Sequence, residues 1–321
     1  MAEITSAYEA FEAVADLDWD DIHDATDLMD QALDEIQADS KVRELIFSEE
    51  LTDGVTVHWR TDVPAGNEDA IKRVAEFAEA GVIDPSKGKL MFAKIDAYAT
   101  ALRVSYEQTK LKGGKAVQRE LTHLARSIQM HDSRSALDAL NAAVNETDLD
   151  KKVESLAATT PWTNPDANPL DDDLLRANEL IMSAEKDGIQ YGYTGNVLWV
   201  NPVTGSRLKN NKSIRDLYVG NIASENPTFN ESGVIAGQFT MIPDPALPLG
   251  DAYLLQGGDV SGSTVGTEFV WEDGQAEISA FYADGEGSRG GRTRSFRADY
   301  SKWNKHGLRA PKAIVKLTNL V

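Results

Sequence analysis

Residues 89–144 read KLMFAKIDAYATALRVSYEQTKLKGGKAVQRELTHLARSIQMHDSRSALDALNAAV. The first part, residues 89–105, is a strand-like run of 17 residues, about three times the mean strand length. Extended at ~3.3 Å per residue it reaches about 55 Å, whereas a compact chain of this size has a radius of gyration near ~20 Å. After Gly113 and Gly114, apolar residues recur at helical spacing, which predicts a helix over 115–144 of about 45 Å. These elements predict a chain shaped to contact its neighbours rather than to enclose a substrate.

The composition allows a large core and excludes several kinds of chemistry. The chain has 321 residues, of which 41% are hydrophobic, enough for a core divided over two subdomains. It has no Cys, which excludes disulfides, thiolate zinc sites and cysteine nucleophiles. The first residues lack a basic segment followed by an apolar stretch, and no apolar run reaches about 18 residues. We therefore expect neither a secretory signal nor a membrane span.

The net charge of −20 is unevenly distributed along the chain. Residues 1–40 hold 13 acidic residues and no Lys or Arg, whereas residues 286–316 hold nine basic and two acidic residues. The two segments are either separate solvated faces or surfaces that attract each other, within one chain or between copies. We hypothesise that residues 1–40 dock on the basic residues of another copy, namely Arg289, Arg292, Arg294, Arg297, Lys302, Lys305, Arg309, Lys312 and Lys316.

The remaining pattern predicts a mixed α+β chain. Residues 6–38 read as helices. A strand over 54–61, a short helix over 68–80 and the long run then form a hairpin that leaves the body and returns. A connector rich in Pro, Asn and Thr at 146–170 predicts a subdomain boundary. A helix over 171–186 follows, and strands are expected at 196–201, 239–242, 252–255, 267–271, 276–282, 293–300 and 311–317.

No motif supports an active site. Residues 285–290 match GxGxxG in letters, but the alternation after them is that of a strand, whereas a dinucleotide site needs a helix there. The acids at 171–173 have a sufficient reason as a helix start, and the five histidines include no HExxH pair. Aromatic residues within the basic stretch leave nucleic-acid binding open, although strand alternation accounts for Phe296 and Tyr300 as one face. We expect no catalytic, cofactor or metal site.

Residues 75–128, AEFAEAGVIDPSKGKLMFAKIDAYATALRVSYEQTKLKGGKAVQRELTHLARSI, strongly resemble the major capsid proteins of tailed bacteriophages, which have the Hong Kong 97-type fold. The C-terminal half supports this resemblance through the helix DDDLLRANELIMSAEKDG, the strand VLWVNP, the stretch PDPALPLGDAYLL and the closing APKAIVKLTNL, in that order. The resemblance covers about residues 45–321. It is greatest to capsid proteins of phages that infect actinobacteria.

The resemblance implies an α+β Hong Kong 97-type capsid fold that is divided by region. The implied parts are an acidic helical N-terminal arm over 1–54, an extended loop over 55–98, a peripheral domain with a long spine helix over 99–157, an axial domain over 158–257, peripheral-domain strands over 258–310 and a final axial-domain strand over 311–321.

The resemblance also implies where subunits meet. The candidate contact residues, from the extended loop and the basic end, are Lys72, Arg73, Phe77, Lys87, Lys89, Arg292, Arg294 and Arg297. Some relatives join a loop Lys covalently to an Asn of another subunit, assisted by a buried carboxylate. Lys87 and Lys89 lie in the corresponding loop, but the sequence identifies neither the Asn nor the carboxylate.

The implied function is that of a major capsid protein, which assembles as hexamers and pentamers into an icosahedral shell around a double-stranded DNA genome. The expected partners are other copies and a portal protein, with scaffolding and decoration proteins as further candidates. DNA would be enclosed without sequence-specific binding, and no cofactor, metal or membrane is expected. The expected location is the virion capsid, assembled in the cytoplasm of the host bacterium. The alternatives are an encapsulin-like shell of a cellular nanocompartment and, more remotely, an enzyme of unknown type.

Overall fold

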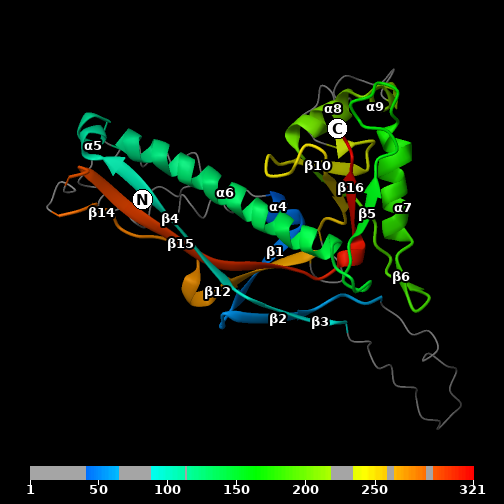
Figure 1. Ribbon diagram of the computed structural model, residues 1–321, viewed down its shortest axis with the longest axis horizontal. Helices are drawn as coiled ribbons and strands as arrows, with labels where there is room; N and C mark the ends of the chain where they lie inside the picture. The colour runs from blue at the N-terminus through cyan, green and yellow to red at the C-terminus, as the bar shows by residue number, and fades with distance from the viewer. Residues whose placement is uncertain (1–40, 65–87, 113, 218–233, 259–263, 287–291) are drawn as a thin grey trace, which may run out of the picture. The chain divides into compact units, whose positions relative to one another are not determined.

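The computed structural model describes residues 41–64, 88–112, 114–217, 234–258, 264–286 and 292–321 (Figure 1). The helices predicted over 6–38 and 68–80 lie outside these residues. Within the described part of the chain, no helix is long and apolar enough to cross a membrane. The chain divides into two compact units, one within residues 1–57, 93–136 and 268–306, and one within residues 58–92, 137–267 and 307–321.

The long strand-like run is two strands rather than one. It forms β3 (Leu90–Lys94) and β4 (Asp96–Ser105), which are separated at Ile95. Ile95 is buried, and its N–H donates to the carbonyl oxygen of Val55 at 2.8 Å. β3 pairs with β2 (Thr56–Arg60), whereas β4 pairs with β15 (Ser295–Leu308). The prediction of a single strand was therefore wrong, because the two halves of the run have different partners.

The long helix is confirmed as α6 (Gly114–Val144), whose 31 residues extend about 45 Å at 1.5 Å per residue. Its first half is amphipathic, and the apolar face is fully buried at Val117 and Leu121. A short helix that was not predicted, α5 (Tyr106–Lys112), connects β4 to α6. A further short helix, α4 (Lys41–Leu45), opens the described chain.

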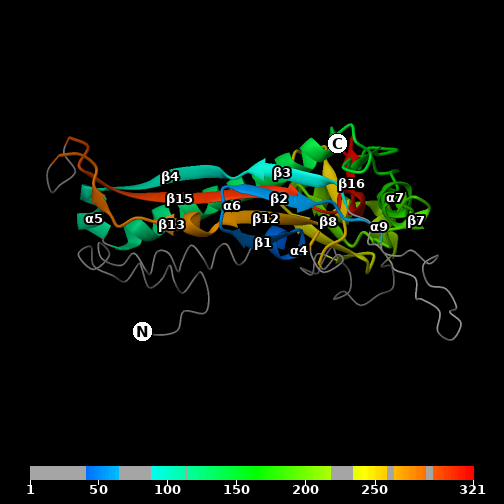
Figure 2. The same cartoon turned by 90° about the horizontal axis from the view of Figure 1, so that it is seen from below.

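A six-stranded sheet is built around β15 (Figure 2). β4 pairs along one edge of β15, and the short β13 (Glu277–Ile278) and β14 (Tyr282–Ala283) pair along the other. β12 (Gly266–Trp271) also pairs with β15, and β1 (Phe47–Thr52) follows it outward. The strand expected over 276–282 is thus two short strands. β15 is 14 residues long, much longer than the expected 293–300.

The even-numbered side chains of β15 point into the first unit. Phe296, Ala298 and Tyr300 join a core with apolar residues of α6, as strand alternation predicted for the two aromatic rings. The next even-numbered residues, Lys302 and Asn304, are also buried, at 3% and 0% exposure. The inward face of one strand therefore changes from apolar to polar halfway along its length.

The second unit contains another six-stranded sheet, in the order β5-β16-β11-β8-β10-β9. Its strands are β5 (Glu154–Ala157), β8 (Val197–Val200), β9 (Val234–Ile235), β10 (Phe239–Pro243), β11 (Ala252–Leu255) and β16 (Ile314–Thr318). Every residue of β8 and β11 is buried. α7 (Arg176–Met182) packs on β16 and β11, and α8 (Pro202–Asn210) packs on β10. Neither α8 nor the following α9 (Lys212–Leu217) was predicted.

The helix predicted over 171–186 ends early. It begins as a π-helical turn at Pro169–Leu175, continues as α7 and stops at Met182. Residues 185–190 form a hairpin of β6 (Glu185–Lys186) and β7 (Ile189–Gln190). Asp187 and Gly188 at its turn have φ of 54° and 80°. Positive φ at both central residues is the geometry that Asp-Gly favours in two-residue hairpins, so the polar dipeptide makes a turn instead of ending a helix.

Candidate assembly surfaces

Hydrogen bonds join the two ends of segment 62–88. We call the four residues that make these bonds, Arg60, Thr61, Gly88 and Lys89, the loop stem. Thr61 N–H donates to the carbonyl oxygen of Lys89 at 3.0 Å, and Lys89 N–H donates to Thr61 Oγ1 at 2.9 Å. Arg60 donates to the Gly88 carbonyl oxygen at 2.9 Å. A Cβ at Gly88 would overlap the carbonyl oxygen of Thr61. The stem therefore requires glycine at this position.

Ion pairs within the second unit hold Lys89. Its Nζ lies 2.8 Å from Asp148 and 3.7 Å from Asp150, and Lys186 lies 3.0 Å from the same Asp150. The hydrogen bond to Asp148 raises the pKa of Lys89 above its ordinary value. Lys89 was predicted to contact another subunit, and in the described chain it has partners of its own.

A second polar contact lies beside the stem. Tyr193 donates its hydroxyl to Asp62, and its ring stacks on Tyr191 at 5.1 Å between centroids. Burial and this hydrogen bond raise the pKa of Tyr193, so the phenol remains a donor at neutral pH. The residues at both ends of segment 62–88 are thus fixed by hydrogen bonds within the unit.

The other predicted contact residues divide into two groups. Lys72, Arg73, Phe77 and Lys87 lie outside the described residues. Arg292 and Arg294 are exposed in the turn before β15, with Arg294 at a φ of 44°. Arg297 lies on the outward face of β15 and pairs with Asp299 at 2.6 Å, while Asp299 also accepts from the Tyr282 hydroxyl at 2.6 Å. These residues remain predicted contacts.

The basic end of the chain is largely neutralised by its own carboxylates. Among the basic residues that the structure describes, ion pairs join Arg297 with Asp299, Lys302 with Glu268 and Asp132, Lys305 with Asp96, Lys312 with Glu154, and Lys316 with Asp251. In the described part of 286–316, much of the positive charge is therefore paired with carboxylates and does not form a continuous basic surface. This weakens the hypothesis that residues 1–40 dock there.

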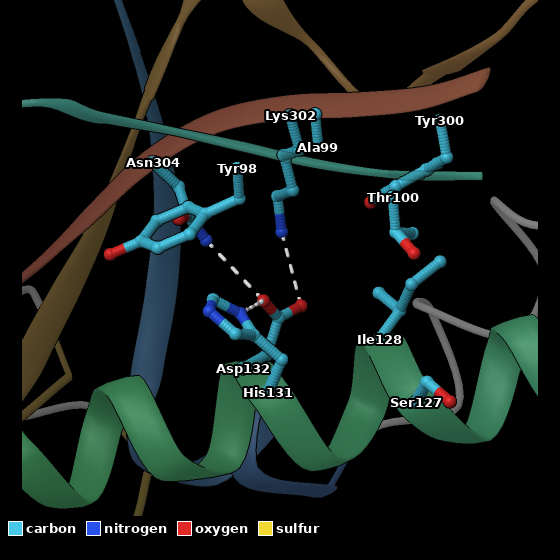
Figure 3. Close-up of a pocket in the computed structure, with 10 residues that line it drawn as sticks. All are labelled: Tyr98, Ala99, Thr100, Ser127, Ile128, His131, Asp132, Tyr300, Lys302 and Asn304. Atoms are coloured by element: carbon cyan, nitrogen blue, oxygen red, sulfur yellow. Dashed lines mark hydrogen bonds and ion pairs between the residues drawn. The ribbon is translucent and has the colours of Figure 1, made fainter.

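A charged cluster lies in the first unit, and we define it as Arg43, Asp132, Glu268, Lys302, Asn304 and His306. The last four of these residues are buried, whereas Arg43 and Asp132 are partly buried. Figure 3 shows Asp132 in contact with His131, Lys302 and Asn304. Lys302 Nζ and Asn304 Nδ2 both donate to Glu268 Oε1, each at 2.6 Å. Lys302 also lies 3.2 Å from Asp132 of α6. Arg43 Nε lies 3.0 Å from the second oxygen of Glu268. Two basic and two acidic side chains thus balance within this cluster.

The charges in the cluster set the protonation of its members. Burial alone would raise the pKa of Asp132, but the hydrogen bond with His131 and the charge of Lys302 lower it to about 2. Burial would likewise raise the pKa of Glu268, and the charge of Lys302 lowers it instead. His306 is different, because burial lowers its pKa and keeps the ring neutral. Its Nδ1 lies 3.0 Å from Ser135 Oγ, and its ring meets Phe47 edge-on at 5.0 Å.

A hollow of about 260 Å³ lies beside this cluster (Figure 3). β4, α6 and β15 line it. Its lining residues are Tyr98, Ala99, Thr100, Ser127, Ile128, His131, Asp132, Tyr300, Lys302 and Asn304. In the described part of the chain, no group of three or more His, Cys, Asp or Glu side chains is placed to hold a metal ion.

Sequence reasoning missed the charged cluster, although one signal was available. Strand alternation places Lys302 on the same face as Phe296 and Tyr300, and a lysine on an inward face needs a buried partner. That partner, Glu268, lies 34 residues away on β12. Its identity depends on which strands are neighbours, and the sequence pattern does not contain that information.

Comparison with known proteins identifies the class of protein to which this fold belongs. Residues 89–316 match the phage capsid protein family. Among solved structures, a virus-like particle from Pyrococcus furiosus has 14% identity and a TM-score of 0.54, covering 90% of this chain and 97% of that chain. The capsid of cyanophage P-SCSP1u has 8% identity and a TM-score of 0.53, covering 84% and 86%. A structure from Mycobacterium phage Che8 has 12% identity and a TM-score of 0.50, covering 82% and 84%. No curated protein matches.

The architecture is thus an α+β structure with the Hong Kong 97-type capsid fold. Because the family match spans more than half of the chain, this protein belongs to the phage capsid protein family. It is a structural protein of the virion capsid and not an enzyme.

Proposed function

We propose that this chain is the major capsid protein of a tailed phage and that it assembles as hexamers and pentamers into the icosahedral shell around the double-stranded DNA genome. The family match over residues 89–316 carries the proposal. Exposed apolar side chains support it, since β3 presents Leu90 at 43% and Phe92 at 71% exposure. Such side chains on a monomer are expected to be covered by a partner.

Electron microscopy of the purified chain tests this proposal. We expect closed particles with five-fold and six-fold capsomers. A monodisperse monomer under all assembly conditions, or open filaments, would contradict it.

The loop stem offers a matched pair of variants. Gly88→Ala places a methyl group against the Thr61 carbonyl oxygen, whereas Gly250→Ala meets no atom within 4 Å. If the stem sets the direction of segment 62–88 for contacts between copies, Gly88→Ala subunits fold but give few shells, and Gly250→Ala subunits assemble normally. Equal shell yields from both variants would show that the geometry of the stem is not needed for assembly.

We also propose the division into arm, extended loop, peripheral domain and axial domain with the boundaries given above, together with a portal protein and scaffolding or decoration proteins as partners. The genome would be enclosed without sequence-specific binding. The net charge of −20 supports this, because binding to DNA phosphates depends on basic surfaces. We further propose an actinobacterial host, on the sequence resemblance. Plating the phage on a panel of bacteria tests that assignment.

The second candidate function is a cellular nanocompartment. The fold match to the Pyrococcus furiosus structure, which is described as a virus-like particle and not as a phage capsid, covers 90% of this chain and is the reason for this alternative. The contents of particles isolated from the native source distinguish the phage shell from the cellular compartment. Double-stranded DNA supports the phage shell, whereas an enclosed enzyme supports the compartment.

A further inference from the structure

The outer edge of β4 is a second candidate surface, and its hydrogen-bonding groups can be assigned. Tyr106 N–H donates to the Arg294 carbonyl oxygen at 2.8 Å, and the register pairs Ser105 with Ser295. In an antiparallel pair, residues that exchange hydrogen bonds alternate with residues that do not. The even-numbered residues of β4 therefore direct their N–H and C=O groups toward β15. The odd-numbered residues, including Ala99, direct theirs outward.

Within the described residues, β4 pairs with β15 alone. Its length of 10 residues makes this a long open edge. Native proteins protect such edges with lysines, prolines, bulges or covering segments. The central sequence of β4, Ala97–Ala101 (AYATA), contains no charge, proline or glycine. The odd-numbered alanines in it are exposed.

The charges at the two ends of the edge are already paired. Asp96 lies 2.7 Å from Lys305, and Arg103 lies 2.7 Å from Asp284. An approaching strand therefore meets a neutral backbone flanked by neutralised side chains. This favours a contact made by main-chain groups over one made by charge.

The hollow described above lies along the inner side of the same strand (Figure 3). Tyr98, Ala99 and Thr100 of β4 form one wall, and Ile128 and His131 of α6 face them. Strand addition combines main-chain hydrogen bonds with pockets that take alternate side chains of the added strand. At about 260 Å³, the hollow has room for one large side chain.

We propose that an extended segment of a second copy of this chain adds to β4 as a further strand and places a side chain in the hollow. A second copy is favoured because the chain belongs to the phage capsid protein family, so that copies of itself surround it in the shell. Because the centre of this edge carries no charge, it is not suited to bind DNA or a strongly charged partner. The inference rests on shell assembly, which is tested separately by the particles themselves.

Residue-resolved hydrogen exchange tests the proposal directly. Dissociated subunits are compared with shells assembled from the purified chain alone. We expect the amides of Ala97, Ala99 and Ala101 to exchange about tenfold more slowly in shells, the effect of one hydrogen bond worth ~1.4 kcal/mol. The amides of Tyr98 and Thr100, which already face β15, should be protected in both states.

The pattern of exchange separates the outcomes. Intact shells in which the three alanine amides exchange as fast as in subunits would overturn the proposal. Protection that appears only when another phage protein is added would also overturn it, because the occupant would not be a second copy. A failure to form shells at all would instead contradict the proposed function.

Two substitutions at one position provide a test by mutation. Ala99→Pro removes an outward N–H, a change that edge strands tolerate, whereas Ala99→Ser keeps the N–H and a small side chain. We expect Ala99→Pro subunits to melt as a folded protein and to give at least about tenfold fewer shells, while Ala99→Ser assembles normally. Ala101→Pro should repeat the loss. Shell yields unchanged in both proline variants would contradict the added strand.

Discussion

The inward face of β15 has two halves that meet the same helix in opposite ways. In the first half, Phe296 and Tyr300 pack on apolar residues of α6 such as Leu121. In the second half, Lys302 and Asn304 meet Asp132 of α6 and Glu268 of β12. The backbone geometry continues from one half to the other, so the difference lies in the side chains.

The two halves differ in what they tolerate. Apolar packing depends on volume and shape, so a substitution that conserves volume changes stability little. A buried ionic site depends on all its members, because each remaining charge is left without compensation when one is removed. We therefore expect the apolar half to respond in proportion to the atoms lost and the polar half to respond to any single loss.

The largest effect is expected for Lys302→Met. This change leaves Glu268 and Asp132 buried with one fewer cation, and breaking a buried pair in this way costs about 3–5 kcal/mol. Urea unfolding of dissociated subunits measures it. The comparison of the two halves would fail if this variant unfolded at the same urea concentration as the original chain.

Leu121→Ala provides the matching test in the apolar half. Leu121 is completely buried, and truncation of such a residue costs about 2–5 kcal/mol because of the lost transfer free energy and the cavity. Leu121→Met conserves volume and should cost less than about 1.5 kcal/mol. Glu268→Gln in the polar half conserves volume equally well, yet we expect it to destabilise more than Leu121→Met. If the two volume-conserving variants have the same stability, the halves do not differ as proposed.

A smaller effect is expected on the pH dependence of stability, which should come from the polar half. Burial lowers the pKa of His306 in the folded chain, so below the ordinary value near ~6.5 the unfolded state takes up the proton first. Stability is therefore lost as the pH falls from about 6.5 toward the lower folded pKa. Asp132 and Glu268 do not contribute in this range, because their lowered pKa values keep them ionised.

Urea midpoints at pH 7.5 and pH 5.5 measure this dependence. His306→Gln should reduce the difference between the two midpoints. A difference that remains unchanged in His306→Gln would assign the acid sensitivity to other groups.

The smallest effect is expected on the outward face of β15. Arg297→Ala removes an exposed ion pair with Asp299, and exposed pairs of this kind contribute little to stability. Subunits of this variant should unfold like the original chain. If Arg297 is an inter-subunit contact, as predicted from the sequence, shell yield falls nonetheless. A normal shell yield would show that Arg297 is not an inter-subunit contact.

The main elements could be predicted where local pattern decides them. The spacing of Val117, Leu121 and Leu124 fixes the face of α6 without knowledge of its partners. The turn at Asp187 and Gly188 could also be predicted, since Asp-Gly is a strong hairpin signal, whereas the prediction over 171–186 treats these residues as the end of a helix. Likewise, Asn201 followed by Pro202 is a helix start, which the structure uses to begin α8.

Features that depend on distant partners could not be predicted. The interruption at Ile95 follows from pairing with two different strands, and a run of alternating residues does not specify its neighbours. The pairing of Lys305 with Asp96 depends on the register of β15 against β4. For the same reason, the sequence predicts a basic surface at residues 286–316, although Lys302, Lys305, Lys312 and Lys316 pair with carboxylates that are distant in sequence.

The loop stem has a consequence for how this protein can vary. Because two hydrogen bonds between Thr61 and Lys89, one to a backbone carbonyl and one to the Thr61 hydroxyl, hold the ends of segment 62–88 together, the strands on either side do not depend on the length of chain between them. Doubling the length of a flexible loop costs only about 0.6 kcal/mol of closure entropy. Positions between Asp62 and Gly88, and not the stem residues themselves, are therefore natural points for insertions, and a foreign peptide placed there should leave the folded subunit intact.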